Sequence, residues 1–390
     1  MNRPFILSLS LIFLLFSYTN VVVRAQEVIT SAEWGTIEVK PFVLTVSLRD
    51  PRYRSIPPRN AWYFPEWDIH KTQQFINSIP GSPELKKSLI NKIQKSSDPA
   101  GSLLMPSDED ILGLPADARA LIYNYLAGFF ENYEQKTAQR YPGASMEEWI
   151  GNVKLKPETL VLLDKLSYRN GTALFLSDQY LLLSLIEDKN EKFAVYKALR
   201  REATMRLSLR VDESMDLDRI AAYWGYGGHE DDVLPVLESL LESGNDIDMV
   251  YLLPPLARDL IYRFPSLDNK LSIMQDCHWT SLNFFGQLND SPASAENLEE
   301  TFTRNFVSIR KEDLRFGDVV LYLYGNDNKM FPIHSSVYIC ADIVYTKNGI
   351  DSFSPWMYMR EDDVESFYSF GRKLTKKYLR RMPLTPLSAN

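Results

Sequence analysis

LRFGDVVLYLYGNDNKMFPIHSSVYICADIVYTKNG, residues 314–349, is the stretch that decides the fold of the carboxy-terminal part of this chain. Gly317 and Asp318 form a turn signal, and the apolar run 319–324 that follows is typical of a buried strand. Residues 333–340 and 343–346 predict two further strands, separated by a turn at 341–342. Three consecutive strands with short connections indicate an antiparallel meander.

The segment before this meander, DCHWTSLNFFG at 276–286, predicts a helix. Asp276 is a favourable N-cap residue, which makes Cys277 the first helical residue, and Gly286 is typical of a helix end. A second short helix is expected over 295–306. A helix followed by an antiparallel meander is an α+β arrangement, so residues 271–390 are predicted to form a domain in which the helix packs on the sheet.

The part of the chain before residue 271 has a different pattern of apolar residues. Residues 26–66 contain β-branched residues and prolines, which predict an extended, strand-containing segment. Residues 67–270 carry amphipathic stretches with helical spacing, and we expect a mainly α-helical amino-terminal region there. The strongest of these stretches are 85–95, 118–130, 175–187, 191–205 and 232–243. The prediction is therefore a multidomain chain, helical first and α+β second.

A short internal similarity lies within the predicted helical region. LPADARALIYNY at 114–125 and LPPLARDLIYRF at 253–264 share seven residues, among them Arg119 and Arg258. The similarity suggests a duplicated helical unit, although two copies are fewer than a solenoid requires. Spacing of the apolar residues favours core packing over ligand binding for this motif.

The first residues predict export from the cytoplasm. Arg3 precedes the apolar run 5–16, and small residues follow with the spacing of a cleavage site at Ala25. This is the pattern of a signal peptide over residues 1–25. The apolar run is too short for a bilayer, which needs roughly 20 residues. We expect a secreted or periplasmic protein without an integral membrane span.

The composition of the chain limits the kinds of molecule that it could bind. The chain has a net charge of −8, and loss of residues 1–25 removes two arginines and no acid. Nucleic acid is an unsuitable partner, because its recognition requires a basic surface. The glycines of WGYGGHEDD at 224–232 lack phosphate-binding spacing, so neither a cofactor nor a metal is expected. The basic segment 372–381 predicts a solvated helix end or a terminal segment.

Chemistry is suggested by Cys277 at the helix start. Backbone N–H groups point outward there, and the positive end of the helix dipole favours a thiolate. A nucleophilic thiol needs a base, and His278 is unsuitable because neighbouring helical side chains diverge. His70 and His229 lie in the predicted helical region, which leaves His334 at the start of a strand.

Strand alternation identifies partners for His334. Ser336, Tyr338 and Cys340 share its face of the strand, and an even register would bring Thr346 and Asn348 of the next strand to the same face. Either of these two could orient the imidazole as the third member of a triad. The N–H group of Cys277 would be one donor of an oxyanion hole.

The order of these motifs, DCHWTSLNFF, then GDVVLY, then IHSSVYICADIVY, resembles the NlpC branch of the papain-like cysteine hydrolases. The resemblance covers about the last 120 residues. It implies a papain-like fold, Cys277 as nucleophile and His334 as base. Thr346 is the third residue by NlpC-type spacing, and Asn348 by the more papain-like pattern. The implied reaction is cleavage of amide bonds in peptides, such as the stem peptides of peptidoglycan.

Two alternatives compete with catalysis. Cys277 and Cys340 are the only cysteines and could form a disulfide, which would separate Cys277 from His334, because six strand residues span roughly 20 Å. The chain could also be a non-catalytic secreted binding or assembly protein, with a degenerate hydrolase domain and a helical region that binds a protein partner.

Overall fold

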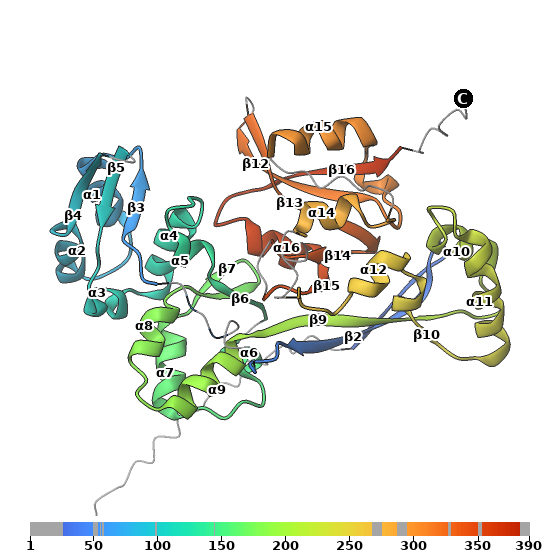
Figure 1. The fold of residues 1–390 in the computed structure, drawn as a ribbon, viewed down its shortest axis with the longest axis horizontal. Coiled ribbons are helices and arrows are strands. Elements are labelled where there is room, and N and C mark those ends of the chain that lie inside the picture. The colour runs from blue at the N-terminus through green and yellow to red at the C-terminus, as the bar shows by residue number, and fades with distance from the viewer. Residues whose placement is uncertain are drawn as a thin grey trace, which may run out of the picture.

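A computed structural model describes residues 26–49, 54, 56, 58–97, 100–143, 145–266, 275–286, 295–326, 329–349 and 353–382. The predicted signal peptide, residues 1–25, lies outside them. Within the described residues the chain forms fifteen α-helices and four antiparallel sheets (Figure 1). Three of these sheets lie in the part of the chain that precedes residue 270, where mainly helices were expected.

Two long strands, β2 and β9, belong to a four-stranded sheet in the order β1-β2-β9-β10. Its strands are β1 (Glu27–Ser31), β2 (Gly35–Thr45), β9 (Arg201–Arg210) and β10 (Ile247–Asp248). β2 and β9 form the long ribbon that runs below the six-stranded sheet in Figure 1. Met205, Leu207 and Leu209 are buried at every second position of β9, which is the period of a strand. They share a core with α10 (Leu217–Trp224) and α11 (Glu230–Ser243).

Two three-stranded sheets lie between β2 and β9 in sequence, in the orders β3-β5-β4 and β6-β8-β7. The first contains β3 (Trp62–Pro65), β4 (Ile93–Ser97) and β5 (Ala100–Leu104), with helices α1 (Ile69–Ser78), α2 (Pro83–Ile90) and α3 (Asp108–Gly113). The second contains β6 (Gln139–Pro142), β7 (Tyr168–Asn170) and β8 (Ala173–Leu176). The neighbouring helices are α4 (Ala116–Leu126), α5 (Tyr133–Lys136), α6 (Met146–Ile150), α7 (Pro157–Leu166), α8 (Gln179–Ser184) and α9 (Lys189–Leu199).

The two related stretches of the sequence take different structures. Residues 116–126 form the regular helix α4, whereas the second copy forms the short helix α12 (Pro255–Leu260), after the 3-10 helix η2 (Met249–Leu252). Ile261 then pairs with Trp356, and Tyr262 has a positive φ of 62°. The shared residues therefore serve a helix in one copy and a helix end in the other.

The carboxy-terminal part forms a six-stranded antiparallel sheet in the order β11-β16-β12-β13-β14-β15. Its strands are β11 (Phe306–Ile309), β12 (Val319–Asn326), β13 (Lys329–Cys340), β14 (Ile343–Lys347), β15 (Trp356–Arg360) and β16 (Thr375–Arg381). The three strands expected from residues 314–349 fall within β12, β13 and β14. The associated helices are α14 (Cys277–Leu282), α15 (Ala295–Asn305), α16 (Glu361–Tyr368) and the 3-10 helix η3 (Lys311–Asp313).

Both faces of this sheet are buried, and they belong to different cores. Val337 and Ile339 of β13 pack in the core that includes α10, α11 and Phe284 after α14. Tyr338, which points to the opposite face, packs in a core that extends from residue 62 to residue 374. The expected layout, a mainly α-helical amino-terminal region followed by a papain-like helix-and-sheet domain, is therefore wrong. The amino-terminal part holds three sheets, and its hydrophobic core continues into the carboxy-terminal sheet.

The basic segment 372–381 is also not a helix end, because it contains strand β16 between β11 and β12. Arg380 of β16 forms an ion pair of 2.7 Å with Asp318, whose side chain is fully buried. Asp318 follows Gly317, which has a φ of 87° and lies so close to the Phe285 ring that a Cβ would clash with it. Glycine is needed at this turn for both reasons.

Candidate active site

Helix α14 begins at Cys277, as expected. The side chain of Asp276 accepts a hydrogen bond of 2.8 Å from the Trp279 N–H group, which is the arrangement of an N-cap. The first N–H groups of a helix have no acceptor within the helix, and the N–H of Cys277 is one of them. Thr280, on the next turn, accepts a bond of 2.9 Å from the Trp356 indole of β15 and ties α14 to the sheet.

Both cysteines are free thiols, so the alternative of a Cys277–Cys340 disulfide is not what the structure holds. Cys340 lies on β13 and is fully buried, and burial raises the pKa of its thiol well above the usual range. It is therefore a poor nucleophile. Cys277 is 4% exposed, and its carbonyl oxygen lies 3.3 Å from the Ser335 hydroxyl of β13.

His334 is positioned on β13 by a break in the strand register. Tyr322 of β12 pairs with His334, but Leu323 pairs with Pro332, so Ile333 is an extra residue on the β13 side. A bulge of this kind bends the strand and redirects a neighbouring side chain. The His334 ring is fully buried and stacks on Tyr368 of α16, with 4.0 Å between the ring centroids.

The imidazole of His334 is oriented by Thr346. Its Nε2 lies 2.9 Å from Thr346 Oγ1, and the Thr346 hydroxyl lies 3.5 Å from the carbonyl oxygen of Ser335. A carbonyl oxygen can only accept, so the threonine proton is directed to Ser335 and Nε2–H donates to Thr346. This tautomer leaves a lone pair on Nδ1, which has no hydrogen-bond partner among the described residues.

Cys277 is a further neighbour of the His334 ring. Burial lowers the pKa of His334, and the interaction with the Cys277 thiol opposes this shift, so the two groups are in electrostatic contact. The imidazole is consequently neutral at neutral pH and able to accept a proton. Cys277, His334 and Thr346 are thus brought together from α14, β13 and β14.

Asn348 occupies a different place. Its side-chain oxygen accepts a bond of 3.4 Å from the Tyr368 hydroxyl, and its nitrogen lies 3.3 Å from the Met359 sulfur. It reaches His334 only through the Tyr368 ring. Of the two residues considered as third member of a triad, Thr346 contacts the histidine and Asn348 supports the ring stacked on it.

The other histidines lie elsewhere or have another partner. His278 points to the Ser335 hydroxyl, with Nδ1 at 3.0 Å, and that hydroxyl lies 3.3 Å from the carbonyl oxygen of Cys277. These contacts fix the first turn of α14 on β13. His70 is exposed on α1 and bonds to Gln74, and His229 precedes α11.

Residues that the sequence did not indicate complete the surroundings of His334. Tyr368 comes from α16, and the Arg140 guanidinium of β6 lies 5.5 Å from the Tyr368 ring centroid. The β7–β8 turn holds α16 in place, because Asn170 donates a bond of 2.8 Å to the carbonyl of Ser366. These contacts join segments that are almost two hundred residues apart in sequence. No local sequence pattern predicts such contacts.

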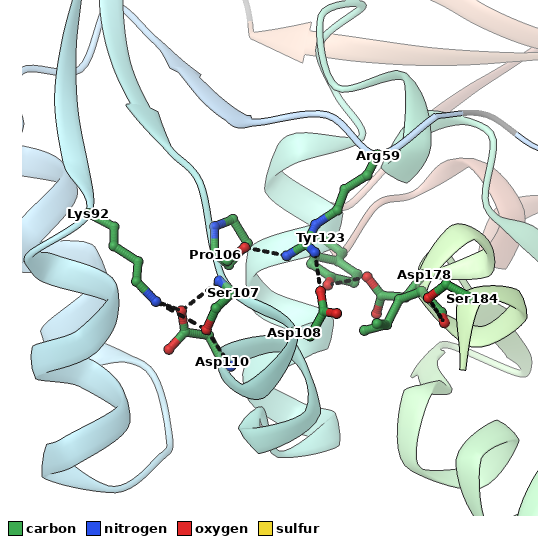
Figure 2. A network of polar contacts seen from close by, with 10 residues as sticks. Arg59, Lys92, Pro106, Ser107, Asp108, Asp110, Tyr123, Asp178 and Ser184 are labelled. Atoms are coloured by element: carbon green, nitrogen blue, oxygen red, sulfur yellow. Dashed lines mark hydrogen bonds and ion pairs between the residues drawn. The ribbon is translucent and has the colours of Figure 1, made fainter. Parts of the chain in front are cut away.

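A second polar cluster is buried between α4 and the start of α8 (Figure 2). Arg119 forms an ion pair with Asp178. The Tyr123 hydroxyl donates a bond of 2.7 Å to the same carboxylate, as Figure 2 shows. Figure 2 also shows Arg59 bonded to Asp108 and to the carbonyl of Pro106. Arg119 is fully buried whereas Arg258, its counterpart in the related stretch, is exposed. The motif at 114–125 is thus a core element, with Arg119 joining α4 to Asp178.

The described residues contain no group of three or more His, Cys, Asp or Glu side chains that could hold a metal ion. Across the same part of the chain, every helix is too short or too polar to cross a membrane. No family model, curated protein or solved structure matches this chain. The function is therefore argued from the geometry around Cys277 and His334.

Proposed function

We propose that this protein is an exported cysteine hydrolase that cleaves amide bonds through a thioester on Cys277, with His334 as the base. The observation that carries this proposal is the orientation of the imidazole. Its Nε2–H is held at 2.9 Å by Thr346, and Nδ1 is left for the Cys277 thiol. A nucleophile, a base and a group that orients the base are the parts required for acyl transfer.

In the proposed mechanism, His334 Nδ1 takes the thiol proton as Cys277 Sγ attacks the carbonyl carbon. The N–H of Cys277 donates to the oxygen that becomes negative. His334 then gives its proton to the leaving amine, and the acyl group remains on sulfur as a thioester. Water, deprotonated by His334, attacks the thioester; the acid leaves, and the Cys277 thiolate takes the proton back from His334. Nε2–H remains bonded to Thr346 throughout, which keeps the reactive lone pair directed to the thiol.

The proposed substrate is a peptide, with the stem peptides of peptidoglycan as the class suggested by the NlpC-type motifs. The predicted signal peptide would bring the enzyme to such substrates as a secreted or periplasmic protein. Both statements rest on the sequence pattern. The geometry of the site supports acyl transfer to a thiol.

The burial of the site favours a second function. Cys277 is 4% exposed and His334 is fully buried, so a substrate must displace a covering group before it reaches the thiol. A binding or assembly protein with a degenerate hydrolase domain would have no need of that access. In this alternative the amino-terminal part contacts a protein partner, and the histidine and cysteine serve only packing.

Alkylation of the native protein separates these two functions. We expect iodoacetamide to modify Cys277 and not Cys340, whose thiol is fully buried and protonated. His334→Gln should lower the rate at Cys277 by about a hundredfold or more, because the general base is lost. His70→Gln is the matched control, since His70 is an exposed histidine on α1.

The sites and rates of alkylation are read by peptide mapping and intact mass, with circular dichroism to confirm that each variant is folded. Equal Cys277 rates in the His334→Gln and wild-type proteins would contradict the catalytic proposal. Modification of Cys340 alone would do the same. Either result would favour the binding or assembly protein.

A further inference from the structure

Arg140 of β6 is a half-buried arginine whose contacts within the protein are mainly with aromatic rings. Its guanidinium donates one hydrogen bond, of 3.0 Å, to the carbonyl oxygen of Lys136, in a solvent-exposed position. Among the described residues it forms no ion pair with an acid. Arg119, which is buried, and Arg360 and Arg380, which are half-buried like Arg140, each have a carboxylate partner. A guanidinium has five N–H donors, so most of the donors of Arg140 have no acceptor among the described residues.

Aromatic rings surround this guanidinium and hold it in place. Its central carbon lies between 5.5 and 5.9 Å from the ring centroids of Phe175, Phe367, Tyr368 and Phe370. Phe175 is also the residue directly opposite Arg140 in the β6–β8 pairing. Rings on which an arginine stacks fix its orientation without using its hydrogen-bond donors. The group is therefore positioned in advance with its donors free for a ligand.

This arginine is adjacent to the proposed active site. Tyr368 contacts both Arg140 and the His334 ring, and the positive charge of Arg140 adds to the lowering of the pKa of His334. Phe370, the last of the four rings, has a positive φ of 45°, which is unfavourable for a residue with a side chain. Strain of this kind is concentrated at functional sites, where surrounding contacts enforce it.

We propose that Arg140 binds a carboxylate of the substrate next to the amide bond that Cys277 cleaves. The inference rests on the proposed hydrolase function and adds the substrate class, a peptide with a free carboxylate close to the scissile bond. A planar guanidinium matches a carboxylate with two parallel hydrogen bonds. No acid among the described residues competes for it. The amino-terminal part of the chain would then select the substrate by supplying this one cation.

The first test compares two reagents of nearly equal size, iodoacetate and iodoacetamide, on Cys277. Arg140 should favour the anionic reagent, so Arg140→Gln should lower the ratio of the iodoacetate rate to the iodoacetamide rate by about tenfold. Arg140→Lys keeps the charge and should retain part of the ratio. Arg210→Gln is the matched control, because Arg210 is exposed on β9 and bonds to Asp246, and it should leave the ratio unchanged.

A second readout does not depend on the thiol. In Cys277→Ser, N-acetylalanine should raise the melting temperature more than its neutral amide, and Arg140→Gln should abolish the difference. An unchanged reagent ratio together with no Arg140-dependent stabilisation would overturn the inference, while His334-dependent alkylation would still uphold the hydrolase. Arg140-dependent stabilisation by the acid, with Cys277 inert to both reagents, would uphold the carboxylate site and reject the hydrolase.

Discussion

Glu134 of α5 offers a quantitative test of the buried polar cluster. The side chain is 2% exposed, and its backbone N–H donates a bond of 3.0 Å to the Asn60 side chain. Burial raises the pKa of Glu134 to about 8, and the charge of Asp178 adds to the shift, whereas Arg59 opposes it. The folded protein therefore holds a proton on this carboxyl at neutral pH, and the unfolded chain releases it.

The sign of the pH effect follows from these two states. The pKa of Glu134 is raised from 4.5 in the unfolded chain to about 8 in the folded one, so the stabilisation is complete below 4.5 and is lost as the pH rises through about 8. Between these values the free energy of unfolding should fall by about 1.4 kcal/mol per pH unit. The loss amounts to roughly 4 kcal/mol between about pH 5 and about pH 8.

Glu134→Gln replaces the protonated carboxyl with an uncharged group of the same shape. The free energy of unfolding of this variant is measured by urea denaturation followed by tryptophan fluorescence. It should not show the fall with rising pH that Glu134 causes in the wild type. The difference between variant and wild type should therefore change by roughly 4 kcal/mol in favour of the variant across that range. Glu131→Gln, at an exposed glutamate shortly before α5, is the matched control. A constant difference between Glu134→Gln and wild type across the range would refute the reasoning.

Two further predictions concern buried hydrogen bonds. Thr346→Val should lower the free energy of unfolding by about 1–3 kcal/mol and slow alkylation of Cys277, because His334 Nε2–H loses its acceptor. Thr346→Ser keeps the hydroxyl and should preserve both the stability and the rate. Identical urea and alkylation results for the Val and Ser variants would contradict the assigned tautomer. Arg119→Met should cost about 3–5 kcal/mol by leaving Asp178 unpaired, and adding Asp178→Asn should recover part of this cost in a double-mutant cycle. A single-variant cost below about 0.5 kcal/mol would show that the pair is not desolvated.

The sequence predicted strands well where one pattern was dominant. The run 319–324 is apolar throughout and lies in β12, with both faces of its sheet covered. Asp276 and Cys277 were placed at a helix start, and the side chain of Asp276 caps α14 there. Local chemistry decides such features, because the capping bond and the turn need only neighbouring residues.

The strands of the amino-terminal part were missed for a physical reason. Residues 191–205 were read as one helix, but α9 ends at Leu199 and β9 begins at Arg201. Residues 201–205 are REATM, which favour helix by propensity, and pairing with β2 overrides that preference. The sequence did contain a strand signal, the apolar residues at every second position from Met205 to Leu209, which are buried. The residues with helical propensity directly before Met205 concealed this alternation.

The same limit applies to the surroundings of the candidate site. Sequence alternation placed Thr346 on the face of His334, and the two side chains are in contact. Arg140 and Tyr368 could not be found in this way, because β6 and α16 meet only through tertiary packing. A single arginine in a short strand does not indicate a binding site by its sequence alone. Its role depends on whether a carboxylate lies beside it, which only the three-dimensional structure shows.

The position of β16 has a consequence for biosynthesis. This strand follows every other strand of its sheet in sequence, yet it lies between β11 and β12 and pairs with both. A nascent chain that has not yet emerged to Arg381 leaves the edge of β12 open and Asp318 without Arg380. The sheet that carries His334 therefore gains its last strand only after synthesis has passed β16.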